Sequence, residues 1–268
     1  METFIKTGPF NPALTLTGGQ AFRWARLTDT TYRGIAHGRV ITVTAERNGI
    51  RLIGADPADL PLWREYFDAE TDYAAITRCF SSDKILREAC KFAQGLRLLR
   101  QEPFETLISF IISQNNNISR IRKIIDTLCR NFGAEIQKDC YGFPTAETLA
   151  GLDVAALAPL KAGYRAGYII NAARAVLHDE INLRDLFECD TTEARQRLMK
   201  FKGVGEKVAD CVLLFAYGKA TFPKDVWIKK ALGEFYPDGL PDCIRGNEGN
   251  AQGIAQQYLF EFVRNRKT

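Results

Sequence analysis

The sequence has few features of a membrane or secreted protein. Its longest apolar runs, LISFII and CVLLFAY, are far shorter than the ~18–20 residues that a membrane-spanning helix needs. The N-terminal METFIKTGPFNP lacks the basic region and apolar run of a signal peptide. The seven cysteines are scattered and none forms a C-x-x-C pair, so neither a disulfide framework nor a zinc site is indicated. We expect a soluble protein of a reduced compartment, with no membrane partner and no metal.

Composition and charge are those of an ordinary globular protein. Of 268 residues, 46% are hydrophobic and 25% charged, which suits one large domain or two ordinary ones and excludes disorder, collagen and coiled coil. The net charge of +4 is too small to indicate a polyanionic partner. Between Arg195 and Lys230, however, nine basic residues stand against three acidic ones. Such a block is typical of a nucleic-acid site and equally of a solvated helix face.

Two patterns of hydrophobicity divide the chain. Short runs rich in β-branched and aromatic residues occupy 21–27, 31–36, 38–46 and 49–54, with a hairpin signal at Arg47-Asn48-Gly49. From Gln101 onward nearly every segment has helical periodicity. We predict an α+β protein: an N-terminal antiparallel β-sheet module with a few helices over residues 1–97, then an all-helical region over residues 98–268 with a helix-hairpin-helix at about 191–217. The predicted helices lie at 62–67, 85–93, 104–112, 118–128, 145–149, 163–178, 191–199, 206–217, 226–235 and 251–264.

The segment MKFKGVGEKVADC joins two of these helices through Lys202, Gly203, Val204 and Gly205. Its two glycines permit a tight turn with positive φ and close approach of another molecule to the backbone. The second helix begins near Glu206, so its free N–H groups form a ready phosphate site. Any helix corner can contain Gly-x-Gly, but helical periodicity on both sides and flanking lysines favour sequence-independent binding of a DNA backbone.

Lys207 lies in the first turn of that second helix. The positive end of the helix dipole and the nearby Lys202 disfavour its ammonium form and so favour a neutral, nucleophilic amine. A solvent-exposed surface lysine is the simpler interpretation. Asp225, 18 residues further on, sits at an N-cap position, where a carboxylate stays ionised and fixed. This amine and carboxylate suit nucleophilic attack on a deoxyribose C1′, although Asp225 is a structural cap in either case.

Together these residues resemble the helix-hairpin-helix superfamily of DNA glycosylases, with its Gly-Val-Gly-x-Lys and downstream Asp. From about Leu14 to Phe260 the chain is similar to the 8-oxoguanine DNA glycosylase family, through several motifs in the same order. The motifs are GGQAFRW (18–24), LLRQEP (98–103), SQNNNISR (113–120), GYRA (163–166), GVGEKVADC (203–211) and AQQYLF (255–260).

The resemblance implies a bifunctional DNA glycosylase and abasic-site lyase of base excision repair. Such an enzyme removes 8-oxoguanine paired with cytosine from double-stranded DNA, and we expect it to act as a monomer. Lys207 matches the nucleophile that displaces the damaged base, forms a Schiff base with the sugar and leads to β-elimination. Asp225 matches the carboxylate that stabilises positive charge on the ribose. No cofactor is implied, although the hairpin carbonyls leave room for a monovalent cation.

Four residues match the lesion pocket of the family. Gly19 matches the residue whose carbonyl accepts a hydrogen bond from N7–H, a donor that 8-oxoguanine has and guanine lacks, so guanine leaves that carbonyl unpaired. Gln256 matches the amide that hydrogen-bonds the Watson–Crick edge. Phe260 and Cys211 match the residues on either side of the flipped base. Without the motifs they would be taken for a core phenylalanine and a buried helical cysteine.

Four more residues match positions at the duplex. Asn115 matches the side chain that fills the space left by the flipped base, and Tyr164 matches the residue that wedges near the lesion. Arg120 and Arg165 match the arginines that contact the orphaned cytosine, whose O2 and N3 atoms accept hydrogen bonds from guanidinium. The presence of both arginines predicts a preference for cytosine opposite the lesion.

The sequence departs from the family beside Asp225. The family often has Val before this Asp and His two residues after it, where this chain has Lys224 and Trp227. No C-x6-C-x2-C-x5-C follows Asp225, which is evidence against the iron–sulfur branch. Two alternatives remain: a monofunctional alkylbase glycosylase, which uses Asp225 with water and does not need Lys207, and a non-catalytic helix-hairpin-helix DNA-binding protein. We expect a cytoplasmic location, at the nucleoid in a bacterium, or a nuclear one in a eukaryote.

Overall fold

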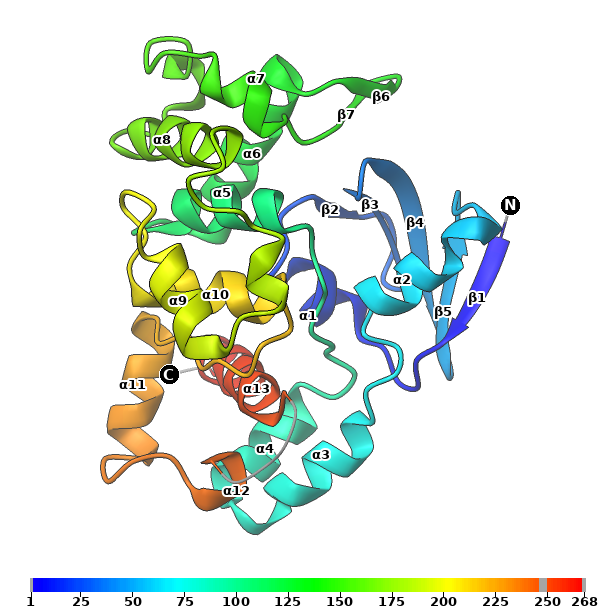
Figure 1. The fold of residues 1–268 in the computed structure, drawn as a ribbon. Helices are drawn as coiled ribbons and strands as arrows, with labels where there is room; N and C mark the ends of the chain where they lie inside the picture. The colour runs from blue at the N-terminus through cyan, green and yellow to red at the C-terminus, as the bar shows by residue number, and fades with distance from the viewer. Residues whose placement is uncertain (1, 246–249, 267–268) are drawn as a thin grey trace.

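The N-terminal part of the chain is built on a five-stranded antiparallel sheet (Figure 1). A computed structural model describes residues 2–245 and 250–266. The strand order is β1-β5-β4-β3-β2, and the predicted hairpin is confirmed, because β4 and β5 pair with Glu46 opposite Gly49. The strands are β1 (Glu2–Lys6), β2 (Trp24–Arg26), β3 (Thr31–Ala36), β4 (Arg39–Glu46) and β5 (Gly49–Ile53).

One face of the sheet is covered by α2 (Figure 1). Successive strand residues point to opposite faces, so alternate residues such as Ile41 and Val43 on β4 lie in the core. They belong to the same buried cluster as Trp63 of α2 and Phe67, which follows it, and both of these aromatic side chains are fully buried. This cluster stabilises the N-terminal part by burying apolar area.

After the sheet the chain is predominantly helical, and the predicted α+β class is confirmed. None of the helices within the described residues combines the length and apolarity that crossing a bilayer requires. The helices are α1 (Pro12–Thr17), α2 (Leu60–Tyr66), α3 (Tyr73–Cys79), α4 (Lys84–Phe92), α5 (Pro103–Ser113), α6 (Ile118–Phe132), α7 (Ala146–Ala150), α8 (Arg165–Leu177), α9 (Thr191–Leu198), α10 (Glu206–Phe215), α11 (Val226–Phe235), α12 (Asp242–Arg245) and α13 (Ala251–Asn265). Short 3₁₀ turns lie at Pro57–Asp59, Phe80–Ser82, Ala158–Leu160 and Asp185–Phe187.

The structure contains elements that the sequence patterns did not predict. These are β1, the short helices α1, α3 and α12, and a hairpin of β6 (Glu135–Gln137) and β7 (Cys140–Tyr141). The hairpin interrupts the region predicted to be all helical. Its strands are two and three residues long and largely exposed, so no buried face imposes an alternating pattern on them. Its turn contains Asp139 at φ +59°.

Helix α13 ties distant parts of the chain together. It packs on α4 from the N-terminal half and on α11 from the C-terminal half, and Figure 1 shows it between them. Ile254, Leu259 and Leu86 of α4 belong to one continuous core cluster. The residues that follow the sheet therefore share a core with the C-terminal helices.

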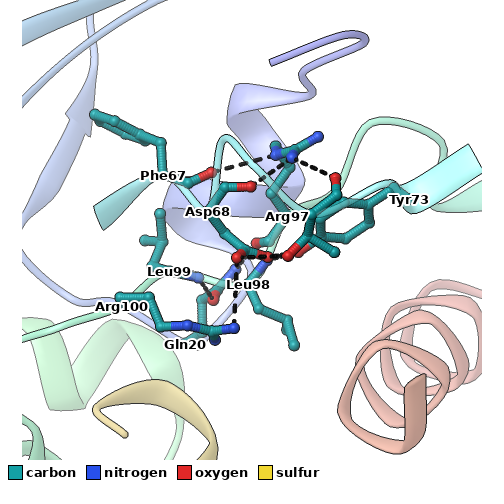
Figure 2. Close-up of polar contacts among 9 residues, drawn as sticks. Gln20, Phe67, Asp68, Tyr73, Arg97, Leu98, Leu99 and Arg100 are labelled. Atoms are coloured by element: carbon teal, nitrogen blue, oxygen red, sulfur yellow. Dashed lines mark hydrogen bonds and ion pairs between the residues drawn. The ribbon is translucent and has the colours of Figure 1, made fainter. Parts of the chain in front are cut away.

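A buried arginine holds the junction between the sheet and the helices. Arg97 is 2% exposed, and its guanidinium donates to four backbone carbonyls, including that of Thr7 at 2.7 Å. The guanidinium carbon also lies 4.2 Å from the centroid of the Tyr73 ring, whose hydroxyl donates to Asp68 (Figure 2). A buried charge is tolerated when its donors are satisfied in this way. The predicted boundary between residues 97 and 98 falls in this junction.

Gln20 extends the junction toward the loop that contains Gly19. The Gln20 side chain is fully buried; its Nε2 donates to the Arg97 carbonyl at 2.8 Å, and its Oε1 accepts from the Leu99 N–H at 2.9 Å (Figure 2). The side chain of Gln101 donates to the Gln20 carbonyl at 2.7 Å. These bonds fix the backbone that directly follows Gly19, so the motif LLRQEP positions the motif GGQAFRW.

Candidate active site

The hairpin between α9 and α10 is the helix-hairpin-helix that the sequence predicts. Gly203 has φ +85°, and a Cβ there would lie 2.3 Å from a ring carbon of Tyr168, so this position requires glycine. Gly205 has an extended φ of −101° and open space around it, so the expectation of positive φ does not hold there. Gly205 is the N-cap of α10 and provides no side-chain cap, which leaves the first N–H groups of that helix available to an anion. Val204 is buried and Lys202 is exposed.

Lys207 is half-buried between α10 and α5, so the interpretation as an ordinary surface lysine is wrong. Its Nζ lies 3.5 Å from Oγ of Ser113 at the end of α5. The same Nζ is 5.3 Å from the centroid of the Phe110 ring. The helix start and the packing of α10 on α5 direct this amine toward a cleft.

Asp225 caps α11, as predicted. Its Oδ1 accepts a hydrogen bond from the N–H of Ile228 at 2.8 Å, which fixes the carboxylate at the start of that helix. Lys224 and Trp227, the two departures from the family pattern, flank it, and both are exposed. The cap leaves the second carboxylate oxygen available for another contact.

Lys207 and Asp225 line the same cleft, which has a volume of about 710 Å³. The cleft lies where the loop between α5 and α6 meets the starts of α10 and α11 and the end of α13. Its lining includes Gly19, Phe22, Phe110, Ser113, Asn115, Lys224, Trp227, Lys229, Phe260 and Arg264.

A smaller cavity adjoins the cleft and brings the predicted pocket residues together. Gly19, Cys211, Gln256 and Phe260 all line it, together with Lys207 and Asp225. Its volume of about 60 Å³ holds a few water molecules at most. An occupant of purine size therefore requires a wall to move. Gly19 and Phe260 are partly exposed, and Phe260 is the one of these two with a side chain that can swing aside.

Two wall residues of the cavity, Cys211 and Gln256, are uncharged, and Gln256 carries an unused acceptor. Burial raises the pKa of the Cys211 thiol to about 11, although the facing Lys207 amine acts in the opposite direction, so the thiol is protonated at neutral pH. Gln256 is 4% exposed, and its Nε2 donates to the Pro223 carbonyl at 3.1 Å. Within the described residues its buried Oε1 has no hydrogen-bond partner. A bound molecule with a donor at this point would satisfy it.

Two of the three asparagines between α5 and α6 make hydrogen bonds that shape the turn, and the third, Asn115, differs from them. Asn116 donates to the Ile112 carbonyl at 3.1 Å, and Asn117 caps α6 by accepting from the Arg120 N–H at 3.0 Å. Asn115 is exposed and has φ +46°, a left-handed conformation that asparagine tolerates. The turn thus presents Asn115 at the mouth of the cleft.

Arg165 has a different place from Arg120. Arg165 is 4% exposed; its Nε and Nη2 both donate to the Gln114 carbonyl, Nη2 also donates to the Asn115 carbonyl at 3.0 Å, and Nη1 donates to the Ala162 carbonyl at 3.1 Å. Its contact with cytosine stays a prediction, for which one Nη1 hydrogen is left. The Arg120 side chain is exposed, and among the described residues its guanidinium makes one hydrogen bond, to the Lys161 carbonyl at 3.2 Å.

Tyr164 protrudes beside these arginines. Its side chain is 54% exposed, and its ring lies 4.6 Å from the Arg165 guanidinium carbon and 5.7 Å from the Tyr168 ring, centroid to centroid. Its role as a wedge stays a prediction. The ring packs on Arg165, which in turn donates to the Asn115 carbonyl, so Tyr164 lies near the Asn115 loop.

Two functional candidates were absent from the sequence predictions. Ser113 lies within reach of the Lys207 amine, and Arg264 lines the cleft. Ser113 begins the motif SQNNNISR, so the sequence offered a signal for it. Arg264, a helical residue near the end of the chain, has no sequence signal beyond its charge.

Comparison with known proteins agrees with this arrangement. A family model described as "8-oxoguanine DNA glycosylase, N-terminal domain" matches residues 3–107. A second, described as "HhH-GPD superfamily base excision DNA repair protein", matches residues 108–239. The chain belongs to the 8-oxoguanine DNA glycosylase family. The resemblance inferred from the motifs is confirmed.

Individual relatives support the assignment along the chain. The N-glycosylase/DNA lyase of Saccharomyces cerevisiae is 42% identical over 183 residues, which are 62% of this chain and 46% of that protein, so the chain spans about half the length of this relative. The structure of MBOgg1 in complex with a low affinity DNA ligand has a TM-score of 0.91 and 41% identity, and it covers 98% of this chain and 95% of its own. The Clostridium acetobutylicum 8-oxoguanine glycosylase/lyase, in complex with double-stranded DNA containing cytosine opposite 8-oxoG, has a TM-score of 0.89 and 34% identity, over 98% and 97% of the chains.

Proposed function

We propose that this chain is a bifunctional DNA glycosylase and abasic-site lyase that excises 8-oxoguanine opposite cytosine in base excision repair. The observation that carries the proposal is the convergence of Lys207 and Asp225 on one cavity with the four predicted lesion-pocket residues, Gly19, Cys211, Gln256 and Phe260. An amine, a fixed carboxylate and a polar pocket at the mouth of a phosphate-binding hairpin are what this reaction requires.

Recognition of the lesion begins with extrusion of the base into the cavity. Phe260 and Cys211 bracket the base, and the unpaired Oε1 of Gln256 accepts a hydrogen bond from its Watson–Crick edge. The Gly19 carbonyl accepts from N7–H of 8-oxoguanine, whereas guanine offers no donor there and leaves the carbonyl unsatisfied. The pocket therefore selects the oxidised base.

The chemical steps use Lys207, Asp225 and water. The neutral amine attacks C1′, the C1′–N9 bond breaks with its electron pair on the base, and the base leaves after taking up a proton. Asp225 stabilises the positive charge that develops on the sugar. The attached nitrogen gives up one proton after the attack. Its lone pair then forms the C1′=N bond as O4′ leaves with its electron pair and takes up a proton, so the sugar ring opens to an iminium that keeps the remaining N–H. Removal of a C2′ proton then expels the 3′ phosphate with its electron pair and nicks the strand.

The protein contacts the duplex at its phosphate backbone and at the gap that the flipped base leaves. The hairpin Lys202–Gly205 binds a phosphate through the N–H groups at the start of α10, and the hairpin carbonyls are where a monovalent cation would bind. Asn115 fills the gap, Tyr164 wedges beside it, and Arg120 donates to the orphaned cytosine with Arg165 behind it. The chain works as a monomer wherever the chromosomal DNA lies, at the nucleoid of a bacterium or in the nucleus of a eukaryote.

Borohydride trapping tests this proposal. The wild-type protein is incubated with a labelled duplex that contains one 8-oxoguanine opposite cytosine, and sodium borohydride reduces any Schiff base to a stable covalent complex. We expect a trapped complex with the wild-type protein and none with Lys207→Gln. Lys230→Gln is the matched control, because it removes an exposed lysine on α11 outside the cleft.

Each of the other outcomes would assign a different function to this protein. Base release without a trapped complex would make the enzyme monofunctional, with Asp225 activating water. If neither base release nor trapping occurred, that result would contradict 8-oxoguanine as the substrate. Alkylated bases would then be tested. Binding of duplex DNA without any base release would support a non-catalytic helix-hairpin-helix protein.

A further inference from the structure

Helix α13 carries an ion pair beside the cavity, between a fully buried carboxylate and a partly exposed arginine. Glu261 is fully buried, and its Oε2 accepts from Arg264 Nη2 at 2.8 Å and from Asn265 Nδ2 at 3.0 Å. Its Oε1 has no hydrogen-bond partner within the part of the chain that the structure describes. A buried ion pair contributes little net stability over an apolar pair of the same shape, so stability alone does not account for it.

Arg264 contacts both sides of the cavity at once. Its Nη1 donates to the carbonyl of Gly18 at 2.6 Å, directly before Gly19, which has φ +113°. Its guanidinium carbon lies 4.9 Å from the centroid of the Phe260 ring. The planar guanidinium has donors in a fixed fork, so one side chain bonds the carboxylate and the loop while it stacks on the ring.

A close approach between Gly18 and Glu261 links the same elements independently. A Cβ on Gly18 would lie 2.6 Å from Glu261 Oε1 and 2.2 Å from the Leu14 carbonyl oxygen. Gly18 therefore has to be glycine for the loop to lie against the carboxylate. The loop, the ion pair and the aromatic ring form one packed unit.

We propose that Glu261 and Arg264 are positioning residues that hold the Gly19 carbonyl and the Phe260 ring in the geometry that accepts 8-oxoguanine and rejects guanine. This inference rests on the proposed function of the cavity. Selection by an unpaired acceptor works only if the acceptor is held in place, because a mobile carbonyl turns away from the N7 lone pair of guanine and bonds water. Arg264 fixes the loop from one side, and Gln20 and Gln101 fix it from the other.

Arg264→Met tests the role, with Arg266→Met as the matched control. Arg266 also pairs with a glutamate, Glu234 at 2.9 Å, and lies 5.4 Å from an aromatic centroid, that of Phe235, but it lines neither the cleft nor the cavity. Two rates are measured in single turnover: excision of 8-oxoguanine opposite cytosine, and nicking at a preformed abasic site, which needs the amine but no base in the cavity. We expect excision to fall about tenfold or more with Arg264→Met, and nicking to fall several-fold less.

Three further measurements complete the test. The ratio of 8-oxoguanine to guanine excision falls with Arg264→Met, and Arg266→Met behaves as the wild type. Arg264→Lys is intermediate, because it keeps the positive charge and a donor group but not the planar fork. Glu261→Gln slows excision, but added to Arg264→Met it has no further effect, since it acts through that arginine. If Arg264→Met does not fold, Arg264→Lys carries the test on the same ratio.

The inference is overturned if Arg264→Met slows excision and nicking equally, or if the two substitutions multiply their effects. Failure of the proposed function is a different result, because the wild-type protein itself would then release no 8-oxoguanine.

Discussion

Replacement of Arg165 by methionine separates a structural role from direct recognition of cytosine. Methionine keeps an unbranched side chain of comparable length and removes every donor. The loop that presents Asn115 would lose the hydrogen bonds that Arg165 makes to the carbonyls of Gln114 and Asn115, and the segment before α8 would lose the one to Ala162. We expect a less stable protein with a displaced loop.

The magnitude follows from the three carbonyls. A carbonyl that loses its partner costs about 1 kcal/mol when water can reach it and up to ~3 kcal/mol when it cannot. Gln114 is partly exposed and Asn115 is exposed, and the buried Ala162 carbonyl keeps the backbone N–H of Arg165 as a partner at 3.4 Å, so the lower figure applies to all three. Three carbonyls at about 1 kcal/mol each lower the free energy of unfolding by about 3 kcal/mol. Arg120→Met removes one exposed hydrogen bond and changes the free energy of unfolding by about 0.5 kcal/mol or less.

Urea unfolding measures the stability of both variants, and excision assays with each of the four bases opposite the lesion measure specificity. We expect Arg165→Met to lose about 3 kcal/mol and to excise more slowly opposite every base to a similar degree. Arg120→Met should retain stability and lose preference for cytosine. Unchanged stability of Arg165→Met, with loss of the preference for cytosine, would refute the reasoning and assign Arg165 to base recognition alone.

Two further substitutions test the hairpin and the buried acid. Gly203→Ala should lower the free energy of unfolding by roughly 1–3 kcal/mol in urea titrations, because its Cβ would meet Tyr168 at 2.3 Å and its φ is +85°. Gly205→Ala, with open space and φ −101°, should retain stability but weaken DNA binding measured by fluorescence anisotropy, and equal destabilisation by both would contradict this difference. Burial raises the pKa of Glu261 to about 7, against the effect of Arg264, so its contribution to stability is present at low pH and lost as the pH rises through about 7. Glu261→Gln removes this loss, so its stability relative to the wild type should increase between about pH 5 and 8 in urea titrations, and a constant difference would show that Glu261 does not titrate there.

The sequence predicts elements wherever burial imposes a period. The run at 31–36 coincides with β3 because its Tyr32 and Ala36 must face the core, and ten helices were placed from their apolar stripes. The β6–β7 hairpin and the short helices α1 and α3 were not predicted, since each has too few buried positions to show a period. Their places are set by local caps such as Asn11 at the start of α1 and by contacts with distant segments.

Within the candidate site, the sequence predicts residues that lie at element boundaries better than residues in helix interiors. Lys207 and Asp225 stand at helix starts, where glycine and aspartate have recognisable roles, and both line one cavity. The motif match brought Gln256 and Phe260 to the same cavity. Glu261 gave no signal, because a charged residue in an amphipathic helix is normally taken as a solvent-facing position, whereas its partner Arg264 is fixed by a loop that lies about 246 residues earlier in the chain.

For the basic block between Arg195 and Lys230, counting charges does not decide between a solvated helix face and a nucleic-acid site. A solvated helix face and a nucleic-acid site differ in whether the charges are already satisfied within the protein, and composition does not contain that information. In the structure the block separates by residue type: Arg195 pairs with Asp210 and Arg197 pairs with Glu193. Lys219 donates to two backbone carbonyls.

The other lysines of the block differ. Within residues 2–245 and 250–266, the side chains of Lys202, Lys224 and Lys229 have no such partner, all three are exposed, and the last two line the cleft. The planar guanidinium suits fixed carbonyls and carboxylates, whereas the flexible ammonium suits a phosphate backbone whose position varies with the bound duplex. Apart from Lys207 and Lys219, the block thus divides into arginines that are paired within the protein and exposed lysines that a phosphate backbone could bind, and this division favours the nucleic-acid interpretation of the block.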